Sequence, residues 1–193
     1  YLNSNKDKVN YKIILFQIIH TLAVIQKDYP DFTHNSLKLG NIFVETLKKD
    51  RLIKYTFENN MFEINSKILI KISSFENSES DKILKGSISS KSNKYHDLLF
   101  FLNKLYKHSN FKYTDSETLD FLNKIFPKKL IGKYNSEELY KPSELLKDNY
   151  FRSLQNNLSE KKSSKQEYMK NILENKNNKF LMTLESDSKR ILG

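Results

Sequence analysis

The segment that decides the fold is a polar stretch placed between an apolar helix and a strand. It reads His34-Asn35-Ser36-Leu37-Lys38-Leu39-Gly40-Asn41. Before it, residues 11–29 carry apolar side chains at helical spacing on more than one face, which predicts a buried helix. Pro30 ends that helix, because proline pushes the residue before it out of the α region. After the stretch, residues 42–44 are typical of a strand.

Three further segments follow this stretch in a fixed order along the chain. Residues 70–76 run from an apolar alternation into a Ser-Phe-Glu tripeptide. Residues 95–102 place one acid, Asp97, immediately before a run of apolar residues. Residues 141–151 begin with Lys-Pro and continue to a Leu-Leu pair and a Tyr-Phe pair. The order of the four segments limits the possible folds more strongly than any single segment does.

The four segments resemble, in order, the landmarks of the C-terminal lobe of protein kinases. The catalytic loop of that family reads H-R-D-L-x-x-x-N. The positions that match it, with a lysine two places after the acid, are His34, Leu37, Lys38 and Asn41. Asn35 replaces the usual Arg, which is similar to the His-Asn-Asp-Leu-Lys form in kinase-like proteins of large nucleocytoplasmic DNA viruses. Ser36 stands where the catalytic Asp is expected.

The second landmark, the D-F-G metal motif, is also changed. Ser74 stands in the place of the Asp, Phe75 is retained, and Glu76 stands in the place of the Gly. The resemblance implies that the metal-binding and nucleotide-binding positions are Asn41, Ser74 and Glu76. Two of the three, Ser74 and Glu76, do not carry the residue usual in kinases. Ser36 and Ser74 are 38 residues apart, a longer spacing than is usual in kinases, and the extra hairpin that this implies is similar to insertions in the viral branch.

The third landmark implies structural roles rather than chemistry. Asp97 resembles the Asp at the start of the central C-lobe helix, which is buried in kinases and anchors the backbone of the catalytic loop. The same resemblance gives His34 an architectural role and Phe75 a structural one. It therefore implies that Asp97 lies buried beneath residues 34–36.

The fold expected from the resemblance is mainly α with a small β-ribbon, like a kinase C-lobe. A complete kinase places a glycine-rich loop and a strand lysine before the first helix of this lobe. Only about ten residues precede that helix, so the N-lobe is absent from this sequence. The chain opens with Tyr1 rather than Met, which indicates a piece of a longer protein, with the N-lobe outside it or lost. We expect a C-lobe-like domain at residues 1–156 and a partly helical or disordered Lys- and Asn-rich tail at residues 157–193.

Local patterns predict the remaining elements. The strand-like runs between the first helix and Ser74 are residues 42–47, 52–57, 62–64 and 68–72, with a turn at Asn59-Asn60. The expected helices are residues 98–106, a helix that opens at Thr114-Asp115 and ends near Phe126 before Pro127, and residues 143–151. Residues 76–93 are rich in serine and lysine and are expected to form a mobile surface loop.

Composition limits the class of protein. The 193 residues suit one domain with a core of its own. The chain has no cysteine and no apolar stretch long enough to cross a membrane, which predicts a protein of a reducing, intracellular compartment. Its 4 histidines show no metal-binding spacing, so no metal site is expected. His20, inside the apolar helix, is expected to be a hydrogen-bonded boundary residue.

The net charge of +10 raises the question of a polyanionic partner. The basic residues are nearly all lysine, and the arginines are Arg51, Arg152 and Arg190. Arginine supplies the bidentate contacts to phosphate, so its scarcity favours a solvated lysine-rich surface over a dedicated nucleic-acid site. We expect any binding of DNA or RNA to be weak, non-specific and lost with salt.

The two serines decide the expected chemistry. In kinases the loop Asp accepts the proton of the substrate hydroxyl, and a neutral hydroxyl such as that of Ser36 cannot do so near pH 7. Mg²⁺ prefers carboxylate oxygen, which Ser74 lacks, so Asn41 is left alone. The catalytic-loop positions Ser36, Lys38 and Asn41 are thus a degenerate site, and no cofactor is expected.

The favoured interpretation is a catalytically inactive kinase-like domain that binds a protein partner. A divergent serine/threonine kinase that binds Mg-ATP is the alternative. It would use an N-lobe outside this sequence and Glu76, which would share a face with Ser74 if that segment is extended. A lysine-rich nucleic-acid-binding module is the third hypothesis.

Overall fold

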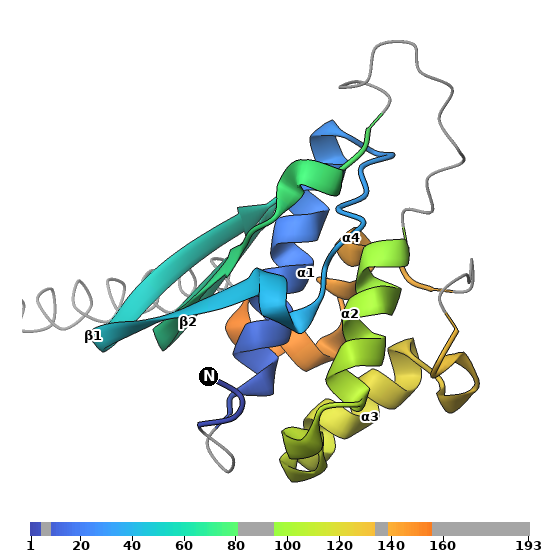
Figure 1. The fold of residues 1–193 in the computed structure, drawn as a ribbon. Coiled ribbons are helices and arrows are strands. Elements are labelled where there is room, and N and C mark those ends of the chain that lie inside the picture. The colour runs from blue at the N-terminus through green and yellow to red at the C-terminus, as the bar shows by residue number, and fades with distance from the viewer. Residues whose placement is uncertain (5–8, 81–94, 134–138, 156–193) are drawn as a thin grey trace, which may run out of the picture. The chain divides into compact units, whose positions relative to one another are not determined.

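Two long strands and four α-helices form the regular structure of residues 1–4, 9–80, 95–133 and 139–155, the part of the chain that this computed structural model describes. In chain order they are α1 (Tyr11–Asp28), β1 (Ile42–Phe57), β2 (Asn60–Ile72), α2 (His96–Tyr106), α3 (Ser116–Ile125) and α4 (Pro142–Leu145). Short 3₁₀ turns lie at Leu39–Asn41, Phe75–Asn77, Ser109–Tyr113, Lys128–Leu130 and Asn149–Leu154. All of these belong to one compact unit, Tyr1–Gln155 (Figure 1).

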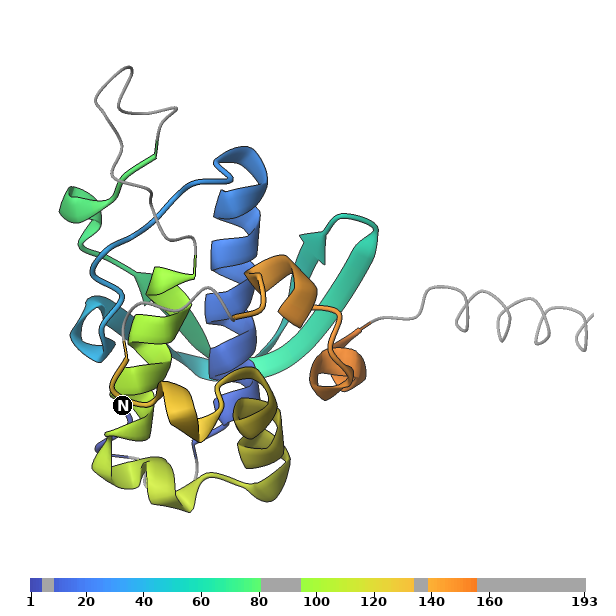
Figure 2. The same ribbon diagram turned by 90° about the vertical axis from the view of Figure 1, so that its right-hand side faces the viewer.

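The first helix, α1, is the central element of this unit. Its start is fixed by Asn10, whose side chain accepts a hydrogen bond from the Ile13 N–H, and it ends two residues before Pro30. The β-ribbon lies along one side of α1 and α2 lies on the other (Figures 1 and 2). Because α1 is covered from both sides, apolar residues are buried around most of its circumference. The prediction of a buried helix here is confirmed.

The ribbon is antiparallel and joins Ile42 to Ile72 at its base. Four residues of β1, at positions 47–50, oppose the single residue Lys67 of β2, so β1 continues through a bulge. The prediction of four separate runs is wrong, because the polar residues after position 47 belong to this bulge and residues 65–67 continue β2. The turn itself is Glu58-Asn59, one residue earlier than predicted, with Glu58 in the left-handed region at φ 53°.

A buried glutamine fastens the ribbon to α1. The Gln17 side chain is 3% exposed. Its amide donates to the Ile68 carbonyl over 3.2 Å, and its oxygen accepts from the Ile70 N–H over 2.8 Å. Both polar ends of the side chain are satisfied by β2, which offsets the cost of burying an amide in the core. Nearby, His20 bonds to the Thr56 carbonyl over 3.1 Å and burial lowers its pKa, which confirms a boundary histidine.

The end of the unit differs from the prediction. Residues 143–151 do not form one helix: α4 stops at Leu145, and Asp148 opens a 3₁₀ turn by accepting from the Tyr150 N–H over 2.9 Å. The new turn lets the Tyr150 ring stack on Phe121 at 4.3 Å, and its hydroxyl bonds to Thr118 over 2.6 Å. Burial raises the pKa of that hydroxyl. Tertiary packing therefore overrides the local helical pattern.

The helices α2 and α3 appear where they were expected. The α2 helix begins one residue before Asp97, and α3 is capped by Asp115, whose side chain accepts from the Thr118 N–H over 2.8 Å. The residue that caps the end of α3 is Phe126, directly before Pro127. The tail predicted at residues 157–193 and most of the loop predicted at residues 76–93 lie outside the described residues. Within the described ranges, no helix combines the length and apolarity that a membrane crossing requires.

Candidate functional site

The polar loop after α1 is held from below by the carboxylate of Asp97. Asp97 is 1% exposed, and its two oxygens accept from the backbone N–H groups of His34 (2.7 Å) and Asn35 (2.9 Å). His96 Nδ1 lies 3.9 Å from the same carboxylate. The prediction that Asp97 lies buried beneath residues 34–36 is confirmed. A buried acid that accepts two backbone donors fixes the path of the loop.

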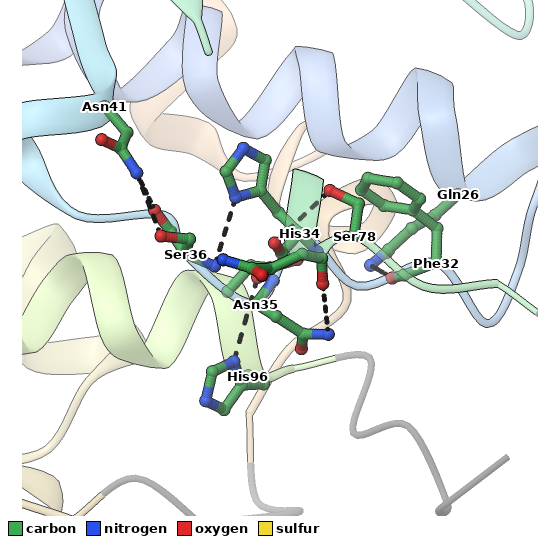
Figure 3. A network of polar contacts seen from close by, with 10 residues as sticks. Gln26, Phe32, His34, Asn35, Ser36, Asn41, Ser78 and His96 are labelled. Atoms are coloured by element: carbon green, nitrogen blue, oxygen red, sulfur yellow. Dashed lines mark hydrogen bonds and ion pairs between the residues drawn. The ribbon is translucent and has the colours of Figure 1, made fainter. Parts of the chain in front are cut away.

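His34 ties the loop to the end of β2. Its Nε2 bonds to the Ser73 carbonyl over 2.9 Å. Its Nδ1 accepts from the Ser36 N–H over 3.3 Å (Figure 3). Because Nε2 faces a carbonyl and Nδ1 faces an N–H group, a neutral His34 ring carries its proton on Nε2. The ring also meets the edge of Phe75 at 4.7 Å. His34 is 1% exposed, and every contact it makes is structural.

Ser36 and Asn41, five residues apart in the loop, contact each other directly. The Asn41 amide donates to both the carbonyl (2.8 Å) and the hydroxyl oxygen (3.0 Å) of Ser36 (Figure 3). Lys38 lies between them and is exposed, and its backbone N–H donates to the Ser36 carbonyl over 2.8 Å. The loop is therefore closed on itself, with a neutral hydroxyl at the position of the expected acid.

The end of β2 joins the same group through Asn41. The Asn41 carbonyl accepts from the N–H of Ser73 over 3.0 Å and from its hydroxyl over 3.2 Å. Ser74 follows with φ 65° and ψ 57°, a left-handed conformation that is uncommon for a residue with a side chain. The structure thus brings Ser36, Asn41 and the Ser73-Ser74 corner into one polar cluster.

Glu76 does not take the position that the kinase alternative requires. That alternative places Ser74 to Glu76 in an extended segment, but Phe75–Asn77 is a 3₁₀ turn. The premise is therefore wrong, because the turn and the left-handed Ser74 remove the two-residue alternation that would align the two side chains. Glu76 is exposed.

The segment after this turn also contacts the loop, and sequence reasoning missed it. Thr33 and Glu79 exchange two backbone hydrogen bonds of 3.0 and 2.9 Å. The Asn35 amide donates to the Asn77 carbonyl over 3.0 Å (Figure 3). Ser80 is 1% exposed and donates to Asp31 over 3.0 Å. These short polar residues carry no periodic signal, so nothing in the sequence marked them.

The donors in the cluster do not suit a divalent metal ion. They are the hydroxyls of Ser36, Ser73 and Ser74 and the amide of Asn41, whereas Mg²⁺ is held by carboxylates. Asp97, the buried acid beneath the loop, is engaged by the backbone N–H groups of His34 and Asn35. In the part of the chain that the structure describes, no group of three His, Cys, Asp or Glu side chains could hold a metal ion.

The left-handed Ser74 gives a test of the local geometry. We expect Ser74→Gly to leave the free energy of unfolding unchanged or slightly higher, and Ser74→Val to lower it by more than about 1 kcal/mol, because a β-branched side chain is strained at positive φ. Thermal unfolding of both variants measures this. At Asn65, an exposed residue inside β2, the same two changes should have the opposite order. Equal stability of the two Ser74 variants would contradict the assigned conformation.

Two curated proteins of Acanthamoeba polyphaga mimivirus are similar to this chain, and each is named a "putative serine/threonine-protein kinase". One is 28% identical over 173 residues, which cover 77% of this chain and 37% of the relative. The other is 39% identical over 66 residues, which cover 32% of this chain and 17% of the relative. The match therefore spans well under half of either relative.

No protein-family profile and no solved structure matches the chain. The chain is nevertheless related to kinase-like proteins of giant viruses, and the resemblance inferred from its motifs is confirmed. The closer likeness to a kinase C-lobe stays a prediction.

Proposed function

We propose that this relative of the giant-virus kinase-like proteins is a catalytically inactive domain that acts by binding a protein partner. The observation that carries the proposal is the contrast between Asp97 and Ser36. The acid that holds the loop backbone is present and buried, whereas the position that would perform chemistry on that loop carries a neutral hydroxyl. A loop that is held in place by Asp97 but has no acid at position 36 suits binding better than catalysis.

Ser36 is a poor general base for a physical reason. A serine hydroxyl accepts a proton only at extreme acidity, and loss of a general base typically costs about 10²–10⁴ in rate. In this structure the Ser36 oxygen already accepts a hydrogen bond from Asn41 over 3.0 Å. A substrate hydroxyl that approached it would meet a group unable to take its proton.

The second defect is at the corner after β2 and is independent of the first. A hydroxyl at Ser74 does not supply the negative charge with which a carboxylate holds a magnesium ion. Glu76, the acid nearest to it in sequence, lies in the following 3₁₀ turn. Two separate losses on either side of Asn41 support an inactive domain more strongly than one.

Exposed aromatic side chains next to the loop favour a protein partner. Phe43, two residues after Asn41, is 58% exposed, and Phe75, which packs against His34, is 45% exposed. Aromatic side chains are enriched in protein–protein interfaces and often carry much of the binding energy. We therefore place the partner surface around the loop, with Lys38 beside it.

The second candidate is an active, divergent serine/threonine kinase. The names of both relatives favour it. It requires Mg-ATP, an N-lobe from elsewhere in the protein, and a carboxylate that reaches the metal position. Glu76 is the residue it would use, although not in the extended geometry that first suggested it.

Binding of Mg-ATP to the full-length protein distinguishes the inactive domain from the active kinase. We expect weak binding by calorimetry, and at least about tenfold tighter binding in Ser74→Asp, because the added carboxylate can hold the metal ion. The left-handed site tolerates an aspartate. Asn65→Asp, on the exposed part of β2, adds the same charge elsewhere and should change nothing. Tight binding by the unaltered protein that Ser74→Asp does not improve would refute the metal-site argument.

A further inference from the structure

An apolar cavity of about 370 Å³ lies against the turn that leads to Asn41. Its walls come from the N-terminal turn, α1, the start of β1, the end of α2 and the residues Leu39 and Gly40. None of the polar side chains of the loop cluster lines it. The cavity is therefore a separate feature from the degenerate site, although the two share one turn of the backbone.

No charged side chain lines the cavity. Charged residues are 29% of the chain, yet no Lys, Arg, Asp or Glu lines this cavity. Its one titratable imidazole, His108, has both nitrogens engaged, by Asn3 over 3.0 Å and by the Asn110 N–H over 3.2 Å. A phosphate or carboxylate would lose its hydration here and gain no counter-charge from a side chain.

The N-terminal wall of the cavity is fixed by hydrogen bonds. The Asn110 amide donates to the Leu2 carbonyl over 2.7 Å, and the Ser4 N–H donates to the Tyr1 carbonyl over 3.1 Å. With the bond between Asn3 and His108, these contacts attach the first four residues to the segment after α2. The cavity is therefore formed before any ligand arrives, as is usual for small-molecule sites.

We propose that this cavity binds an uncharged, planar aromatic molecule of about two fused rings. An apolar cavity of about 150 Å³ holds one benzene ring, so the volume suits a second ring. Aromatic rings of the lining, from Tyr1, Tyr11 and Phe101, suit edge-to-face contact with a flat ligand. The Tyr11 hydroxyl donates to the Asn110 carbonyl over 3.3 Å, which fixes the ring of Tyr11 in the cavity wall.

The occupant would also act on the neighbouring loop. Leu39 and Gly40 line the cavity and form one 3₁₀ turn with Asn41. A ligand that packs against the first two residues restrains the third, whose amide holds Ser36. Occupancy should therefore stabilise the loop and raise the melting temperature of the chain as ligand concentration increases.

The test uses 2-naphthol, an uncharged two-ring probe with one hydroxyl, and naphthalene-2-sulfonate, a charged probe with the same rings. Binding of both to the complete chain is followed by fluorescence titration. Gly40→Leu adds a side chain at the cavity wall, where a Cβ would meet nothing within 4 Å. Val44→Phe fills it from β1. Leu52→Phe, which is 56% exposed on the same strand, is the control.

We expect saturable binding of one 2-naphthol, at least about tenfold weaker in both filling variants and unchanged in Leu52→Phe. The sulfonate should bind at least about tenfold more weakly than 2-naphthol to the unaltered chain. Absence of saturable 2-naphthol binding, equal binding of the two probes, or undiminished affinity in a folded filling variant would each overturn the proposal. The comparison of probes needs no variant, so it decides even if both substitutions prevent folding.

Discussion

Asp97→Ala should lower the free energy of unfolding by about 3 kcal/mol, because one buried and one partly buried backbone N–H group lose a charged acceptor at once. For a chain of this size that corresponds to a fall of roughly 6–12 °C in melting temperature. The donors are those of His34 and Asn35, at 2.7 and 2.9 Å. Alanine also leaves space at a position that is only 1% exposed. Thermal and denaturant unfolding measure the loss.

Two matched variants show whether the effect comes from the carboxylate. Asp97→Asn keeps one acceptor oxygen and should lose an intermediate amount. Asp120→Ala removes an exposed acid from α3 and should change the free energy of unfolding by less than about 0.5 kcal/mol. If Asp97→Ala were as stable as Asp120→Ala, the carboxylate would not anchor the loop, and the structural basis of the kinase-like assignment would be lost.

Restoring both acids should have the largest effect on activity. In the full-length protein we expect Ser36→Asp with Ser74→Asp to transfer phosphate at least about 10² times faster than either single change. Each single change leaves one defect: Ser36→Asp lacks the metal ion, and Ser74→Asp lacks the base. The Asn41 amide, which now donates to the Ser36 oxygen, can donate equally to a carboxylate. Rates of radiolabel transfer compare the three proteins.

The control is the double change Ser36→Asn with Ser74→Asn, which matches the size of the aspartates without their charge. It should remain inactive, because neither amide can act as a base or replace the carboxylate that binds magnesium. If Ser36→Asp alone were as fast as the double change, Ser74 would not be a defect in the metal site. If the Asn pair were active, charge would not be the missing property.

Local sequence patterns predicted the helices well where burial and capping coincide. The helix α1 has apolar residues around most of its surface and a proline just beyond its end, and α3 has an Asp as its N-cap and a proline directly after its C-cap. The contact between Asp97 and His34 spans 63 residues of sequence. No local pattern contains such a contact, and it could be predicted only from the resemblance to kinases.

The errors have physical causes of their own. A bulge and a turn share the same polar residues, so the pairing of residues 47–50 with Lys67 could not be inferred from composition. The helix predicted at residues 143–151 does not form as one element, because stacking of Tyr150 on Phe121 favours a 3₁₀ turn. The orientation of Glu76 depends on the left-handed conformation of one residue, Ser74. Serine rarely adopts that conformation, so the sequence did not predict it.

Inactivity of the kinase-like site is the central claim, and one measurement tests it most directly. Radiolabelled Mg-ATP is incubated with the full-length protein, unaltered or carrying Glu76→Ala, and transfer to protein substrates is counted. With Ser36 and Ser74 at the two acid positions, we expect no transfer above background from either protein. Robust transfer by the unaltered protein that disappears with Glu76→Ala would show an active kinase with a displaced carboxylate, and the claim would be wrong.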